Sequence, residues 1–183
     1  ILSSTKNFMR SWFVVDDKKN GVASLIRDMV ALTGFIFLIA VSLVVTYSVF
    51  VDFNVAINQS AGFNSTHKEF FQQQTDNFPI VWDYTFLTIF VGAIIGVLIL
   101  SYVLQSNPGL FFVLLIFIVM LGGIAGALAN GFEELILDPV MSSSASHFPI
   151  MSFVITHYLF FIIVIGFMML LTFFAKPNGG GFA

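Results

Sequence analysis

Four long apolar runs, separated by polar segments, dominate the chain. They cover residues 29–51, 84–104, 109–129 and 150–174, and none of them contains Asp, Glu, Lys or Arg. A helix needs roughly 20 consecutive apolar residues to cross the hydrocarbon core of a bilayer, and each run meets that length. A barrel strand would instead alternate apolar and polar residues over about ten positions. The sequence therefore predicts an all-α integral membrane protein with four transmembrane helices.

The polar segments predict two helical hairpins in tandem. The first hairpin is expected over 29–104 with an outer loop at 52–83, and the second over 109–174 with an outer loop at 130–149. The segment 105–108 reads as a tight turn, because Asn107 can start a turn, Pro108 fixes φ and the following Gly relieves strain. Helices joined by so short a turn pack antiparallel. Residues 175–183 form a glycine-rich tail that we expect to be flexible.

The two predicted outer loops share a short pattern. Gly62-Phe63 precedes Phe78-Pro79-Ile80, and Gly131-Phe132 precedes Phe148-Pro149-Ile150. Proline is tolerated in the first turn of a helix, since its missing N–H would be unpaired there anyway. Each Phe-Pro-Ile is thus expected to lead into a span. In a chain with 24 Phe residues, the pattern fits either a duplicated hairpin or chance.

Composition supports the membrane class and excludes several kinds of chemistry. Hydrophobic residues make up 58% of the chain and charged residues 9%, whereas soluble domains carry about 25% charged residues. Mean hydropathy is +0.98. The net charge of −3 argues against a nucleic-acid partner, and without cysteine there is no disulfide, thiolate metal site or cysteine nucleophile. We expect no catalytic, cofactor or metal site.

The basic residues predict the orientation. Five of the seven precede the first run, at Lys6, Arg10, Lys18, Lys19 and Arg27, while both predicted outer loops are acidic. By the positive-inside rule, both termini should lie on the inner face. Residues 1–28 read as an amphipathic interfacial helix, or else as a poorly ordered tail; the expected anchors to the membrane surface are Phe8, Arg10, Trp12, Lys18 and Lys19.

Small residues mark candidate helix contacts. Gly92 and Gly96 are four apart in the second run, and Gly122, Gly123 and Gly126 cluster in the third. Such spacing lets helix backbones approach closely in lipid. The contacts would lie either within the bundle or at the interface of a homo-oligomer or partner.

His157 is the one histidine in the four runs. It lies about 10 Å into the last run, where an ionisable side chain is a functional hypothesis by default. Asn130 and Glu133 are its candidate partners for a proton relay or an ion path. The alternative is a neutral histidine bonded to a neighbouring helix. Glu133 and Glu134 point about 100° apart on a helix, so they do not form a paired-carboxylate metal site.

Asn58 and Asn64 each begin an N-x-S/T triplet. This triplet is a glycosylation acceptor in a eukaryotic secretory pathway and has no meaning in a bacterial or viral setting.

Three stretches of the second half resemble small multi-pass membrane proteins of tailless phages that carry an internal membrane. The stretches are Asn107-Pro108-Gly109-Leu110-Phe111-Phe112, the run ending Ala129-Asn130-Gly131-Phe132-Glu133-Glu134, and His147-Phe148-Pro149-Ile150. The resemblance covers roughly residues 77–176 and rests on pattern, not on a diagnostic motif. It implies a virion structural protein, embedded beneath a capsid and contacting capsid or vertex proteins, with no catalytic residues.

The sequence thus favours a structural membrane subunit, not an enzyme, that packs with copies of itself or with other membrane or capsid subunits. A second hypothesis is a small channel, holin or transport subunit that uses His157 with Asn130 and Glu133. A third is an accessory subunit of a large respiratory-type complex, which shares every feature of the first. The absence of acidic and basic residues from the runs favours a structural role over a pore, because an ion path usually needs several polar groups.

Overall fold

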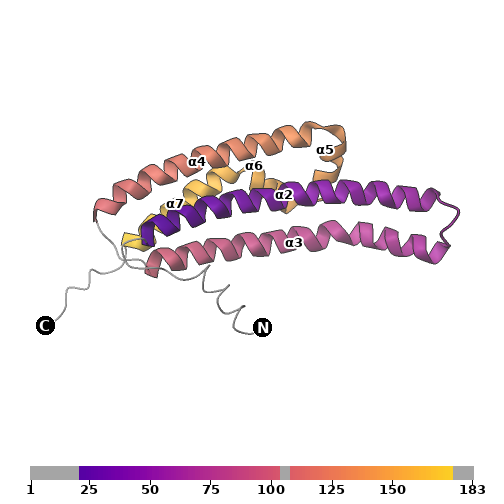
Figure 1. Ribbon diagram of the computed structural model, residues 1–183, viewed down its shortest axis with the longest axis horizontal. Helices are drawn as coiled ribbons and strands as arrows, with labels where there is room; N and C mark the ends of the chain where they lie inside the picture. The colour runs from indigo at the N-terminus through magenta and orange to yellow at the C-terminus, as the bar shows by residue number, and fades with distance from the viewer. Residues whose placement is uncertain (1–20, 104–107, 175–183) are drawn as a thin grey trace.

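A computed structural model of the chain describes residues 21–103 and 108–174 (Figure 1). Over these residues the chain folds into six helices and no strand, which confirms the all-α prediction. The helices are α2 (Gly21–Gln59), α3 (Ser65–Val103), α4 (Pro108–Leu137), α5 (Pro139–Ala145), α6 (Pro149–Thr156) and α7 (Tyr158–Phe174). In the bundle α2 packs along α3, α4 packs along α7, and α7 also lies against α3.

Apolar side chains both fill the bundle and cover its outside. On α2 the buried positions recur every three or four residues, as in Met29, Thr33, Ile36 and Ala40, so one helix face points inward. The opposite faces are also apolar and exposed, for example at Leu38, Val119 and Phe160. Helices that are hydrophobic all round are typical of a membrane span. Three of the described helices are long and apolar enough to cross a bilayer, or four if α6 and α7 are counted as one span.

The first two helices are much longer than the predicted spans. Each has 39 residues, or about 58 Å at the rise of an α-helix, against a hydrocarbon core of about 30 Å. The predicted loop 52–83 is therefore wrong as a loop: it is helical except for residues 60–64. The predicted boundary between the N-terminal segment and the first span, at residue 28, is also wrong, because α2 already includes residues 21–28. Hydropathy identifies only the part of a helix that lipid requires to be apolar.

The second half departs from the predicted hairpin in two places. Most of the predicted loop 130–149 is helical, since α4 continues to Leu137 and α5 follows directly. The Asp138 carboxylate starts α5 by accepting the backbone N–H of Val140 at 2.9 Å. The predicted span 150–174 is not one helix, because α6 and α7 meet at an angle of 71° on either side of His157.

Several predictions fall outside the described residues. These are the tail at 175–183, most of the turn 105–108, and the interfacial anchors Phe8, Arg10, Trp12, Lys18 and Lys19.

Candidate functional site

The two Phe-Pro-Ile segments come together in space. The rings of Phe78 and Phe148 lie 6.4 Å apart, edge to face. Both rings contact Tyr47 of α2, whose ring centroid is 5.9 Å from that of Phe78 and 5.5 Å from that of Phe148. We call this place the junction and define it as Tyr47, Phe78, Asp83, Phe148 and the first turn of α6. It ties α2, α3 and α6 to one another.

Asp83 is the polar centre of the junction. Its carboxylate accepts the backbone N–H of Ile150 at 3.0 Å and that of Met151 at 2.7 Å, and the residue is only 4% exposed. The first N–H groups of a helix have no partner within the helix, and a negative charge is favourable there. The side chain of Phe148, at the N-cap position of α6, makes no capping bond. Asp83 therefore caps α6 from another helix, 67 residues away in sequence.

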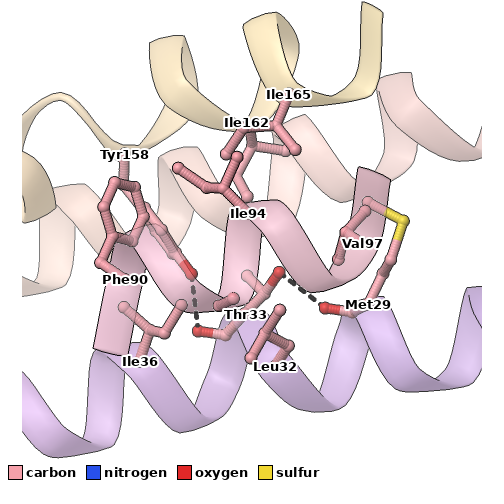
Figure 2. Close-up of a pocket in the computed structure, with 11 residues that line it drawn as sticks. Met29, Leu32, Thr33, Ile36, Phe90, Ile94, Val97, Tyr158, Ile162 and Ile165 are labelled. Carbon is pink, nitrogen blue, oxygen red and sulfur yellow. Dashed lines mark hydrogen bonds between the residues drawn. The ribbon is translucent and has the colours of Figure 1, made fainter. Parts of the chain in front are cut away.

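The start of α7 is anchored separately. Tyr158, the first residue of α7, donates its hydroxyl to the carbonyl oxygen of Thr33 at 3.1 Å, and the Thr33 hydroxyl donates to the carbonyl of Met29 at 2.8 Å. Figure 2 shows Tyr158 reaching from α7 past Phe90 of α3 toward α2. The cavity beside these groups has a volume of about 20 Å³, which is room for one water molecule at most. This site holds helices together and has no space for a substrate.

The predicted polar cluster is not assembled. His157 is exposed, its Nδ1 lies 3.0 Å from the carbonyl oxygen of Phe153, and its ring stacks on that of Phe153 at 4.5 Å. Asn130 and Glu133 are also exposed. Within residues 21–103 and 108–174, no hydrogen bond or ion pair joins His157 to either of them, and no group of three His, Asp or Glu side chains could hold a metal ion.

The predicted packing glycines divide into two sets. Gly122 and Gly126 face Leu159 of α7, and a Cβ on Gly122 would lie 3.3 Å from a methyl carbon of Leu159. These two glycines pack within the bundle. In contrast, a Cβ on Gly92, Gly96 or Gly123 would have no neighbour within 4 Å.

Beyond the junction, α2 and α3 continue as a hairpin with a polar seam. Asn54, only 6% exposed, donates its amide to the Gln72 side-chain oxygen at 2.9 Å, and Gln72 in turn donates to the Asp76 carboxylate at 2.9 Å. The Lys68 ammonium donates to the carbonyl of Asn58 at 2.8 Å. We call residues 48–77 the stalk. In Figure 1 the ends of α2 and α3 run past α5, so the stalk projects from the rest of the bundle.

Sequence reasoning missed two important residues. The predicted outer loop 52–83 ends at Asp83, yet Phe78 to Trp82 before it are apolar, and an acid inside so long an apolar stretch is the signal that marks it. Among the described glycines, Gly166 has the least room: a Cβ there would lie 2.7 Å from a methyl carbon of Ile118. It stands alone in a run of bulky residues, so no spacing pattern indicates it.

No protein-family model matches this chain, and no curated protein or solved structure with which it was compared is similar to it. The junction and the stalk are therefore the features that bear on the function of this chain.

Proposed function

We propose that this chain is a structural multi-pass membrane subunit, which holds a helical stalk outside the bilayer to link the membrane to other subunits of an assembly. The observation that carries the proposal is the change of seam along α2 and α3. The two helices meet through apolar side chains up to the junction, whereas beyond it the hydrogen bond from Asn54 to Gln72 joins them beside the contact of Phe53 with Phe71.

Helix lengths support this placement. From Arg27, which is exposed at one end of the bundle, to Tyr47 in the junction is about 30 Å along α2. That distance matches the hydrocarbon core of a bilayer. The stalk part of α2 then rises about 18 Å further, more than the roughly 5–8 Å of one headgroup layer. At that height, water can complete the hydrogen bonds of the polar side chains in the seam. Leaving those groups without partners in lipid would cost free energy.

The kind of assembly follows from the sequence resemblance. Similarity to membrane proteins of tailless phages favours the internal membrane of a virion, with a capsid or vertex protein next to the stalk. The excess of Lys and Arg before the first run favours a stalk on the opposite side of the membrane from the N-terminal segment. A respiratory-type accessory subunit would use the stalk in the same way. A pore built on His157 has less support, because its expected partners do not contact it.

Photo-cross-linking in native membranes tests the proposal. A photoreactive phenylalanine would replace Phe63, in the turn between α2 and α3, and in a matched control would replace Phe160, an exposed residue of the apolar bundle. We expect a protein adduct of fixed composition from position 63 and mainly lipid adducts from position 160. Adducts to lipid alone at both positions, or only to further copies of this chain, would contradict the proposed link.

A flux assay separates this role from a channel. Proteoliposomes containing the intact chain should be no more permeable to ions than empty liposomes. Flux that disappears in His157→Ala would instead support the channel hypothesis.

A further inference from the structure

A row of three aromatic rings crosses the stalk from α2 to α3. The ring centroid of Phe53 lies 5.8 Å from that of Phe71, and that of Phe71 lies 5.8 Å from that of Phe70. Phe53 and Phe70 are 51% and 55% exposed. By the helix rise, Phe53 stands about 9 Å beyond Tyr47. Adjacent apolar rings at that height are not explained by contact with lipid tails, and an exposed apolar patch marks an interaction surface.

Acidic side chains flank this row. Asp52 precedes Phe53 and Glu69 precedes Phe70 in the sequence, and both acids are exposed. Within the stalk the only lysine or arginine is Lys68, whose ammonium is bonded to the carbonyl of Asn58. Elsewhere, Glu133 and Glu134 near the end of α4 and Asp138 before α5 are also exposed acids. The surface thus combines apolar area with a negative potential.

We propose that the row Phe53–Phe71–Phe70 is a docking site for a basic, amphipathic segment of a partner protein. Apolar side chains of that segment would cover the rings, and its Lys or Arg side chains would pair with Asp52 and Glu69. Arg suits such a site particularly well, because its guanidinium group stacks on aromatic faces and pairs with carboxylates. The proposal deepens the proposed function, on which it rests, by assigning the chemistry of the subunit that meets the stalk.

The negative charge of Asp52 and Glu69 favours a basic protein segment over a second copy of the chain or an anionic lipid headgroup. A second copy of the chain that docked through the same face would bring the same acids against Asp52 and Glu69, and juxtaposed like charges cost several kcal/mol at an interface. Anionic lipid headgroups would be repelled in the same way. A basic segment is attracted at a distance, and the attraction weakens as salt is added.

A defined peptide probe tests the docking site. The full chain would be placed in nanodiscs of phosphatidylcholine and titrated with a labelled amphipathic helix of Leu and Lys, or with its twin in which Glu replaces every Lys. Binding would be followed by fluorescence anisotropy at low and high salt. We expect the basic peptide alone to bind, and its Kd to rise about tenfold or more in Asp52→Asn/Glu69→Gln and in Phe53→Ser/Phe70→Ser.

Matched variants control for general charge and general aromatic loss. Asp28→Asn removes an exposed acid at the opposite end of α2, and Phe160→Leu removes an exposed ring of the apolar bundle; both should bind as the parent does. Glu69→Gln alone, at an exposed position, provides a second test if a double variant is poorly folded by circular dichroism. Its Kd should also rise, by less than that of the double variant.

Four results would each overturn the docking site: no binding, equal binding to empty nanodiscs, equal binding of the acidic twin, or an unchanged Kd in the stalk variants. If one of them occurs while position 63 still cross-links to a protein of the assembly, the docking chemistry is wrong and the structural role stands. If cross-links to protein are absent, the structural role fails whatever the peptide does.

Discussion

The α2–α3 hairpin is helical on both sides of the junction, but its bundle part and its stalk are held together differently. In the bundle part the two helices meet through apolar side chains such as Met29, Ile36 and Phe90. In the stalk, Asn54 donates a hydrogen bond directly to Gln72 across the seam. In lipid, packing and hydrogen bonds hold helices together, because the hydrophobic effect does not distinguish a neighbouring helix from an acyl chain. In water, a hydrogen bond across such a seam stabilises the helix pair most where it is shielded from solvent, as at the buried Asn54.

This difference predicts which substitutions destabilise the bundle and which destabilise the stalk. In the bundle, the costly events are an unsatisfied polar group or a clash, since neither water nor a mobile surface can relieve them. In the proposed placement of the stalk outside the bilayer, water replaces a lost partner, so single changes there should have small and local effects. The following substitutions test that contrast.

Asp83→Ala should have the largest effect. It removes both acceptors from the N–H groups of Ile150 and Met151, at a cost of about 1–3 kcal/mol for each buried group left unsatisfied. We therefore expect a loss of roughly 2–6 kcal/mol in unfolding free energy, measured by titration with sodium dodecyl sulfate in mixed micelles. Asp83→Asn, which keeps one strong acceptor, should lose about half as much.

Asp28→Ala is the matched control for Asp83. Asp28 is half exposed and pairs with Arg27 at 3.3 Å on the surface, so its removal should change stability by about 1 kcal/mol or less. Equal losses at Asp28 and Asp83 would show that Asp83 does not fasten α6.

Gly166→Ala should have the next largest effect. The added Cβ would lie 2.7 Å from a methyl carbon of Ile118, and overpacking of a tight core costs about 1–3 kcal/mol. Ile118→Ala in the same chain should restore part of the loss by removing the clash. Gly92→Ala is the control, because its Cβ meets nothing within 4 Å and alanine is favoured over glycine in a helix. A similar loss at Gly92 would contradict the close approach of α4 and α7.

Asn54→Ala should weaken the stalk alone. The variant loses the bond to Gln72, worth about 1 kcal/mol in water, and the bond that Asn58 donates to Asn54 at 3.3 Å. Hydrogen exchange should quicken at amides of the stalk and stay unchanged at those of α7. Exchange that quickens equally in both places would mean that the two regions unfold as one unit. Asn77→Ala, at an exposed position of the same hairpin, is the control.

The sequence predicts the long apolar helices of this fold well, because such runs are what a bilayer would require. It fails where structure depends on distant partners. The capping of α6 by Asp83 joins residues 67 apart in sequence, and hydropathy gives no sign of it. The bend at His157 follows neither proline nor glycine; it lies between two tertiary anchors, the Asp83 carboxylate and the Tyr158 hydroxyl. The helical stalk was missed because its polar residues, typical of a loop outside a bilayer, pair across a hairpin instead.

Tyr158→Phe should have the smallest effect and tests the second of those anchors. It deletes only the hydroxyl that bonds to the carbonyl of Thr33, and hydrogen bonds between membrane helices average about 0.6 kcal/mol. The ring still fills the space beside Phe90, so the helices should stay packed. In Asp83→Ala the α6 segment has already lost its other anchor, and the same change should then cost more than it does alone. A double-mutant cycle measures this coupling; strict additivity would mean that the two anchors hold α6 and α7 independently.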